Sequence, residues 1–284
     1  DRQLKKGIHY HQCPIDSVDI EANSVTLENG TTLDYDVLLV ATGAVLQPEE
    51  TEGMTGPGWM ESVFTFYDME GSTALAAKLD EFESGHLVIN VIDMPIKCPV
   101  APLEFAFLAD WYFTDKGVRD DVTITYVTPL DGAFTKPTAS ATLGSLLEEK
   151  GIELVTEFNT GEVDGEARKL IGYDGREIDF DIAVVVPLHG GAAYVANSPG
   201  LGDELSEEGV VVPLLRVPED AEGEAALRVL EPLHEPVLRP GDLPQTLTEP
   251  PKALVMVGLD RRMVAENPAE AASRIDAHVV VGER

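Results

Sequence analysis

The feature that most constrains this chain is an apolar strand that leads into a helix through a turn without glycine. The apolar run at residues 86–92 predicts a strand buried in a parallel sheet. Pro102 suits the first turn of a helix that continues to about Lys116. A dinucleotide site at such a turn needs glycines, because the backbone must approach a pyrophosphate closely. Residues 93–104 contain no glycine, so the turn argues against nicotinamide binding.

The same turn carries a thiol. Cys98 follows Lys97 and precedes the predicted helix. A neighbouring cation and a helix N-terminus both favour the reactive thiolate form of a cysteine. We therefore predict that Cys98 is a redox nucleophile and that Lys97 supports it. The alternative is a buried structural thiol, which is a common fate of cysteine.

Strands alternate with helices across residues 86–205, which predicts a Rossmann-like, doubly wound α/β domain. A helix is expected before it at 72–84, capped by Ser72 or Thr73. The aromatic residues Trp111, Tyr112 and Phe113 are expected in the core or an interface, and Glu104 complements its helix dipole. The other predicted elements are strands at 122–127, 152–158, 162–172 and 182–186, and a helix at 137–150.

The sequence patterns at the two ends of the chain predict other structures than the alternating strands and helices of the middle part. Residues 7–43 predict a β-meander with strands at 17–20 and 24–27, a hairpin turn between them at Asn29-Gly30, and a buried strand at 35–40. Residues 45–71 read as an irregular connection. Residues 206–284 form a Pro-rich segment in which 213–250 read as loop or disorder and 253–258 as a strand.

Three further sites have competing interpretations. Gly43 lies where a backbone approaches either a dinucleotide or another strand, or it is a simple turn glycine. His189 follows a buried strand, where ligands of α/β proteins bind, and is either a proton relay or an exposed loop residue. His9, His11 and Cys13 would share one face of a strand, but no fourth zinc ligand lies nearby in the sequence, so we predict no metal site.

The charge of the chain excludes one class of partner. Asp and Glu number 51 against 20 Lys and Arg, which gives a net charge of −31, and the acidic residues are spread along the whole sequence. No basic patch can neutralise phosphates, so nucleic acid is excluded as a partner. A dispersed acidic excess is typical of a halophilic cytoplasm, where salt screens self-repulsion. The alternative is an acidic protein of ordinary salinity.

Three segments together resemble one family of flavoproteins. They are residues 36–44 (DVLLVATGA), 96–105 (IKCPVAPLEF), and 186–191 (VPLHGG) followed by 200–204 (GLGDE). In this order they resemble the sulfide:quinone oxidoreductase branch of the FAD-dependent pyridine nucleotide-disulfide oxidoreductases. The resemblance implies a two-dinucleotide-domain fold. Residues 1–85 would be the end of the first FAD-binding segment plus a connection, 86–205 a glycine-poor NAD-type domain, and 206–284 a divergent end. The family's first strand and Gly-rich turn would precede Asp1, so we expect a truncated chain.

The resemblance also implies a mechanism. FAD would take two electrons from sulfide, a cysteine would carry the sulfur as a persulfide, and quinone would receive the electrons. Cys98 matches one of the family's redox cysteines, with Lys97 and His189 as further catalytic candidates. Ala41, Thr42, Gly43 and Pro99 would contact FAD. A peripheral contact with the inner face of the cell membrane follows from quinone use, the expected location is otherwise cytoplasmic, and a homo-oligomer stays open.

Two alternatives remain open. The chain has no cysteine at residues 60–66 and none after Glu204, where the family carries further redox cysteines. A catalytically inactive module derived from a flavoprotein would have this pattern. Another two-dinucleotide flavoprotein, such as a type II NADH dehydrogenase, would need the phosphate-binding glycines that residues 93–104 lack.

Overall fold

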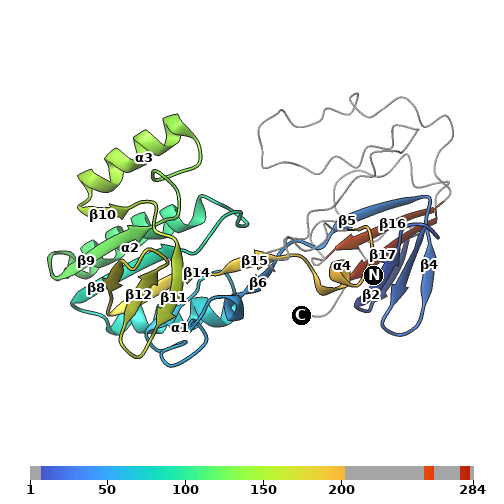
Figure 1. Cartoon of the computed structure of the whole chain (residues 1–284), viewed down its shortest axis with the longest axis horizontal. Coiled ribbons are helices and arrows are strands. Elements are labelled where there is room, and N and C mark those ends of the chain that lie inside the picture. The colour runs from blue at the N-terminus through green and yellow to red at the C-terminus, as the bar shows by residue number, and fades with distance from the viewer. Residues whose placement is uncertain (1–7, 202–252, 259–275, 282–284) are drawn as a thin grey trace. The chain divides into compact units, whose positions relative to one another are not determined.

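The computed structural model describes residues 8–201, 253–258 and 276–281, and it divides into two compact units (Figure 1). One unit is Leu46–His189, and the other contains Asp1–Val45 and Gly190–Arg284. The domain boundaries expected from the sequence, near residues 85 and 205, divide the chain differently and stay a prediction. The stretch 213–250, expected to be loop or disorder, lies outside the described residues.

The Leu46–His189 unit is built on a five-stranded parallel sheet. Its strand order is β10-β9-β8-β14-β7, so the strand that enters the Cys98 turn lies in the middle. Every residue of this strand from Leu87 to Val91 is buried, as expected for a parallel sheet covered on both faces. The strands are β7 (Val63–Phe64), β8 (Gly85–Val91), β9 (Val122–Val127), β10 (Ile152–Val155) and β14 (Ile182–Val186).

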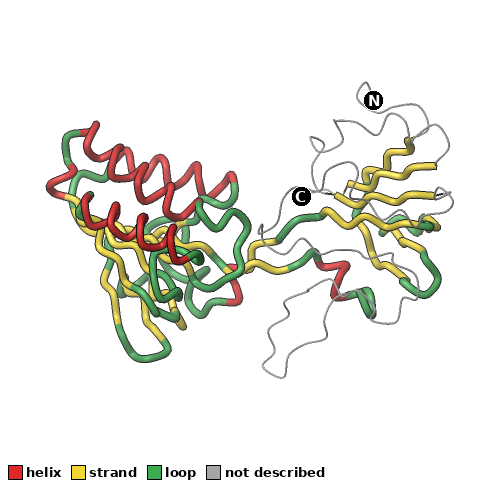
Figure 2. The backbone as a smooth tube through the Cα atoms, turned by 90° about the horizontal axis from the view of Figure 1, so that it is seen from above, coloured by secondary structure: helices red, strands yellow, loops and turns green. Residues whose placement is uncertain are grey.

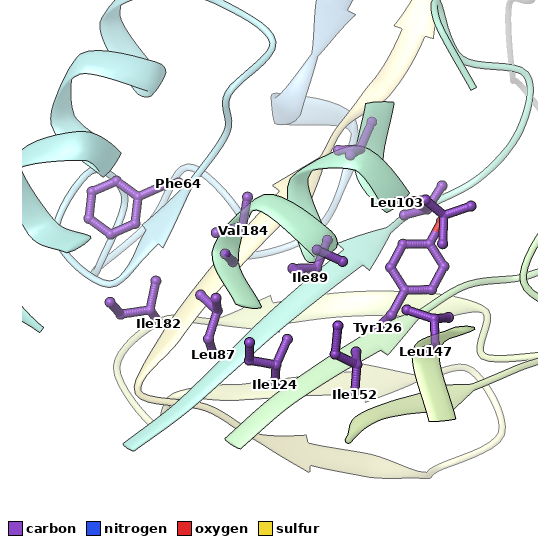
Figure 3. Packing of buried hydrophobic residues seen from close by; sticks show 14 of the residues in the cluster. Phe64, Leu87, Ile89, Leu103, Ile124, Tyr126, Leu147, Ile152, Ile182 and Val184 are labelled. Carbon is purple, nitrogen blue, oxygen red and sulfur yellow. The ribbon is translucent and has the colours of Figure 1, made fainter. Parts of the chain in front are cut away.

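Three helices pack on one face of this sheet and close its main core. They are α1 (Met69–Glu81), α2 (Ala101–Lys116) and α3 (Pro137–Glu149), drawn as red coils in Figure 2. Leu103 of α2 and Leu147 of α3 lie over Tyr126 of β9, as Figure 3 shows. This core includes alternate residues of the central strands, because successive strand residues point to opposite faces.

The opposite face of the sheet is covered by strands. β11 (Thr160–Asp164), β12 (Lys169–Gly172) and β13 (Glu177–Asp179) form an antiparallel sheet. Val163, Leu170 and Phe180 pack there against Val88 and Ala183. The predicted Rossmann-like parallel sheet is therefore confirmed, with a three-stranded sheet as its second cover.

The other unit contains a parallel sheet and a meander. The sheet has the order β1-β17-β16-β5, and the meander has the order β2-β3-β4. Helix α4 (Ala193–Ala196) packs on the meander through Tyr194 and Val195. β6 (Val45–Gln47) pairs with β15 (Leu188–Gly190) where the chain passes between the units. The remaining strands are β1 (Ile8–Gln12), β2 (Ile15–Asp19), β3 (Ser24–Leu27), β4 (Thr32–Asp34), β5 (Val37–Ala41), β16 (Ala253–Gly258) and β17 (Asp276–Val281).

The structure corrects the expected start of the first helix. α1 begins at Met69, and the side chain of Asp68 accepts a hydrogen bond from the Gly71 amide at 2.6 Å. Ser72 and Thr73 were expected as caps, but their hydroxyls instead donate to the Met69 carbonyl oxygen at 3.2 and 2.6 Å. All three residue types can cap a helix, so composition alone did not select Asp68.

One turn and one strand also differ from expectation, and the aromatic residues of α2 differ in burial. Asn29-Gly30 lies between β3 and β4, whereas Asp19 organises the turn from β2 to β3 by accepting bonds from the Glu21 and Ala22 amides. The predicted strand at 162–172 is a hairpin of two strands, β11 and β12. Of the aromatic residues expected in the core or an interface, Phe113 is fully buried in the core, whereas 60% of Trp111 is exposed, so Trp111 is not part of the core.

Candidate functional site

The candidate site lies where three neighbouring strands of the parallel sheet end. Cys98 follows β8, His189 follows β14, and Tyr67 follows β7. These strands are consecutive in the order β8-β14-β7 and run parallel, so their carboxyl ends meet at one edge of the sheet. Ligands of open α/β sheets bind at this edge. The topology therefore gathers residues that are far apart in the sequence.

The Cys98 turn has a constrained backbone. Cys98 is exposed and has a φ of +55°, in the left-handed region that residues with a side chain rarely adopt. Its carbonyl oxygen accepts a hydrogen bond from the Ala101 amide at 3.0 Å, which closes the turn into α2. Pro102 lies in the first turn of that helix. The thiol-bearing residue is thus exposed on a turn that the packed helix fixes.

Tyr67 contacts this turn at two residues. Its hydroxyl donates to the carbonyl oxygen of Cys98 at 3.2 Å. The ammonium group of Lys97 lies 3.5 Å from the backbone oxygen of Tyr67 and 5.6 Å from the centroid of its ring. A cation at this distance from an aromatic ring is attracted to its face. Tyr67 thus contacts both residues proposed for sulfur chemistry, although no motif in the sequence marks it as a site residue.

Tyr67 is held in its neutral form. Burial raises its pKa, and the negative charges of Cys98 and Glu104 raise it further. A protonated hydroxyl can donate a hydrogen bond, which is what the Cys98 carbonyl oxygen receives. Tyr67 therefore adds no negative charge that would cancel the nearby Lys97 ammonium.

His189 offers a buried hydrogen-bond acceptor. Its Nδ1 lies 2.9 Å from the carbonyl oxygen of Pro187, which can only accept, so Nδ1 carries the proton. Burial lowers the pKa of His189, the bond to Pro187 opposes this, and the charge of Lys97 lowers the pKa further. The neutral ring therefore presents an unprotonated Nε2, which is buried and has no hydrogen-bond partner among the described residues.

Aromatic rings pack beside the polar cluster. The rings of Tyr67 and His189 meet edge to face, with centroids 5.3 Å apart. Phe66 stacks on Phe105 of α2 with centroids 4.9 Å apart and an interplanar angle of 10°. Such packing restricts the positions that the neighbouring polar groups can take.

The residues expected to contact a cofactor lie in both units. Thr42 and Gly43 follow β5 in the unit that contains Asp1–Val45, whereas Pro99 lies beside Cys98 in the Leu46–His189 unit. Gly43 has a φ of +71° at the carboxyl end of a parallel strand, which suits a close approach of backbone to a ligand. The Thr42 hydroxyl lies 3.3 Å from that of Tyr194, so it is already engaged in a hydrogen bond. Ala41 ends the strand.

The remaining expectations concern metals and membranes. β1 ends at Gln12, so Cys13 lies beyond the strand that carries His9 and His11. Across residues 8–201, 253–258 and 276–281, no group of three or more His, Cys, Asp or Glu side chains is placed to hold a metal ion. Within the same ranges, no helix is long and apolar enough to span a membrane.

Comparisons with known proteins point to one group of enzymes. No protein-family model matches the chain. A mitochondrial sulfide:quinone oxidoreductase of Dictyostelium discoideum is 25% identical over 191 residues, which are 65% of this chain and 42% of that protein. A sulfide-quinone reductase of Aquifex aeolicus is 30% identical over 126 residues, covering 44% of this chain and 28% of the relative. The chain therefore spans less than half the length of these relatives.

A solved structure shares the fold. The crystal structure of the sulfide:quinone oxidoreductase from Aquifex aeolicus matches with a TM-score of 0.58 and 22% identity. The match covers 67% of this chain and 45% of that protein. At this identity the match shows a common fold.

Proposed function

The chain resembles the sulfide:quinone oxidoreductase branch of the FAD-dependent pyridine nucleotide-disulfide oxidoreductases, and from this premise we propose that it is part of an enzyme that oxidises sulfide at Cys98. The observation that carries the proposal is the position of Cys98. Cys98 is exposed beyond the carboxyl end of the central strand β8 and follows Lys97 in the sequence. Tyr67 contacts both Cys98 and His189.

Each of these residues has a distinct role in the proposal. The Cys98 thiolate carries the sulfur, since a thiolate is the nucleophilic form of cysteine. Joining hydrosulfide to this thiolate forms one S–S bond and releases one proton and two electrons. The Nε2 atom of His189 accepts the proton, because it is an unprotonated acceptor in the neutral ring. Lys97 attracts the anionic substrate.

The cofactor of the proposed reaction is FAD. Ala41, Thr42, Gly43 and Pro99 are the residues that we propose to contact it, and the left-handed Gly43 leaves room for such an approach. When bound, FAD supplies the two-electron acceptor that the sulfur chemistry needs, and quinone is the final acceptor. A halophilic cytoplasm, a peripheral contact with the inner face of the membrane and a homo-oligomer belong to the same proposal.

A catalytically inactive module is the second candidate. Its support is that Cys98 is the only cysteine of the Leu46–His189 unit, since the other cysteine of the chain is Cys13. A second thiol near the first would allow a disulfide exchange cycle. A type II NADH dehydrogenase is less well supported, because the β8–α2 turn lacks the glycines of a phosphate-binding loop.

The two candidates differ in a visible absorption spectrum. The full chain is purified in molar salt, incubated with FAD and freed of unbound flavin. A bound-flavin spectrum that bleaches on addition of sulfide supports the enzyme. Cys98→Ser should then keep the flavin but stop the bleaching, while Cys13→Ser should bleach like the wild type. Flavin that binds but does not respond to sulfide would contradict the enzyme and support the inactive module.

A further inference from the structure

Tyr67 contacts both Lys97 and Cys98, and these contacts bear on the charge of the substrate that the thiol would accept. We propose that Tyr67 is a positioning residue that holds the Lys97 ammonium beside Cys98, so that the thiol reacts with anionic sulfur compounds such as hydrosulfide in preference to neutral ones. The inference rests on the proposed reaction at Cys98.

The geometry assigns separate tasks to the parts of Tyr67. The ring lies 5.6 Å from the Lys97 ammonium, and the backbone oxygen lies 3.5 Å from it. The hydroxyl bonds the Cys98 carbonyl oxygen at 3.2 Å, the same oxygen that receives the Ala101 amide. The ring thus restrains the cation and the hydroxyl restrains the turn. Two consecutive residues, Lys97 and Cys98, are fixed against a third one 30 positions earlier in the sequence.

The net charge of the chain makes a fixed cation important here. With a net charge of −31, the protein repels anions at long range. At an ionic strength of about 0.1 M or higher, salt screens the repulsion between charges that lie more than about 10 Å apart. Charges in close contact are screened much less. A single ammonium group held on the residue next to Cys98 can therefore change how readily an anion approaches this turn.

Other charged and titratable groups around the ring are compatible with this role. The ionised forms of Cys98 and Glu104 both disfavour ionisation of Tyr67, which stays protonated. The charge of Lys97 is felt at His189, whose buried Nε2 is an unpartnered acceptor in the described part of the chain. Lys97 and His189 both lie against Tyr67, and this pairing of a cation with a proton acceptor suits an anionic sulfur compound that still carries a proton. Hydrosulfide is such a compound.

The test compares two alkylating reagents on the full chain. Iodoacetate is an anion and iodoacetamide is neutral, and both react with the same thiol. All variants carry Cys13→Ser, so that Cys98 is the only thiol. The quantity measured is the ratio of the two rates at fixed pH and ionic strength. This ratio reports the local charge and cancels differences in thiol ionisation between variants.

The variants separate the ring from the hydroxyl. Lys97→Gln and Tyr67→Leu should each lower the iodoacetate-to-iodoacetamide ratio by up to about threefold, the size expected when one charge a few ångströms from an anion is removed or displaced at a water-exposed site. Tyr67→Phe keeps the ring and should keep the ratio, while both rates change by the same factor because the Cys98 carbonyl loses its bond. Lys136→Gln removes an exposed charge at the N-terminus of α3 and should leave the ratio unchanged.

Two results would overturn the proposal. A folded Tyr67→Leu variant with the wild-type ratio would show that Tyr67 does not hold the cation. An unchanged ratio in Lys97→Gln would show that no cation selects the reagent. If Tyr67→Leu does not fold, Tyr67→Met takes its place, because it also removes the ring and keeps an apolar side chain. Unchanged rates with both reagents in Tyr67→Phe would remove the hydroxyl from any role. Alkylation needs neither FAD nor sulfide, so these outcomes are independent of whether the full reaction occurs.

Discussion

The two strand ends that the sequence marked as functional differ in how they are built. β8 is buried between a layer of helices and a second sheet, and the turn after it is bonded to α2 and Tyr67. β5 is more open, since 42% of Leu39 is exposed although a buried strand was expected there. Chemistry that needs a fixed nucleophile suits the first location, whereas a strand end with an exposed Gly43 suits contact with a ligand.

This difference predicts that the Leu46–His189 unit loses most stability when the packing of α2 against the sheet is disturbed. Phe113→Ala should lower the free energy of unfolding by about 4 kcal/mol, because it removes a fully buried ring from the main core. Trp111→Ala on the same helix should change it by no more than about 0.5 kcal/mol, because that side chain is mostly exposed. Denaturant titration monitored by circular dichroism measures both. Equal losses for the two variants would contradict the distinction.

The local part of this fold could be predicted from the sequence. The buried strand at 86–92, the helix that begins near Pro102 and the strands at 122–127 and 182–186 all lie within a residue or two of the observed elements. Hydrophobic runs and helix-start residues carry this information, because they act over a few positions along the chain.

The order of the strands could not be predicted in the same way. Tyr67 joins the site because β7, only two residues long, pairs with β14 across more than a hundred residues of sequence. The sequence at 45–71 predicts an irregular connection, which offers no strand end at which to place Tyr67. His189 was identified from its position after a strand, but its bond to Pro187 and its edge contact with Tyr67 depend on the folded arrangement.

A smaller effect is expected at the strand end that carries Thr42. Its hydroxyl pairs with the buried Tyr194 hydroxyl at 3.3 Å, which connects β5 to α4. Thr42→Val keeps the shape of the side chain and removes this bond. The free energy of unfolding of the unit that contains β5 should fall by about 1 kcal/mol. Hydrogen exchange at the Val18 amide, which bonds Ser198, reports on this unit, and Thr42→Ser should restore the wild-type rate.

The smallest effect concerns the protonation of His189, which follows β14 at the same edge of the sheet as the Cys98 turn. The unfolded chain takes up a proton on this imidazole near pH 6.5. The folded chain does so only at lower pH, because burial and the charge of Lys97 lower the pKa against the opposing bond to Pro187. The unfolded state therefore binds more protons in this interval, and the free energy of unfolding falls as the pH decreases from about 6.5 to the folded pKa.

Substitution of His189 should remove this part of the pH dependence. His189→Gln, measured by denaturant titration at a series of pH values, should show a shallower loss of stability below about pH 6.5 than the wild type. The effect is small because the ring is only half-buried and water screens its charge. His189→Asn, which keeps a donor near the Pro187 oxygen, should share the shallow profile and retain more stability at neutral pH. A profile in His189→Gln as steep as the wild type would mean that His189 is protonated as easily in the folded chain as in the unfolded one, which would remove the acceptor that the proposed sulfur chemistry needs at this strand end.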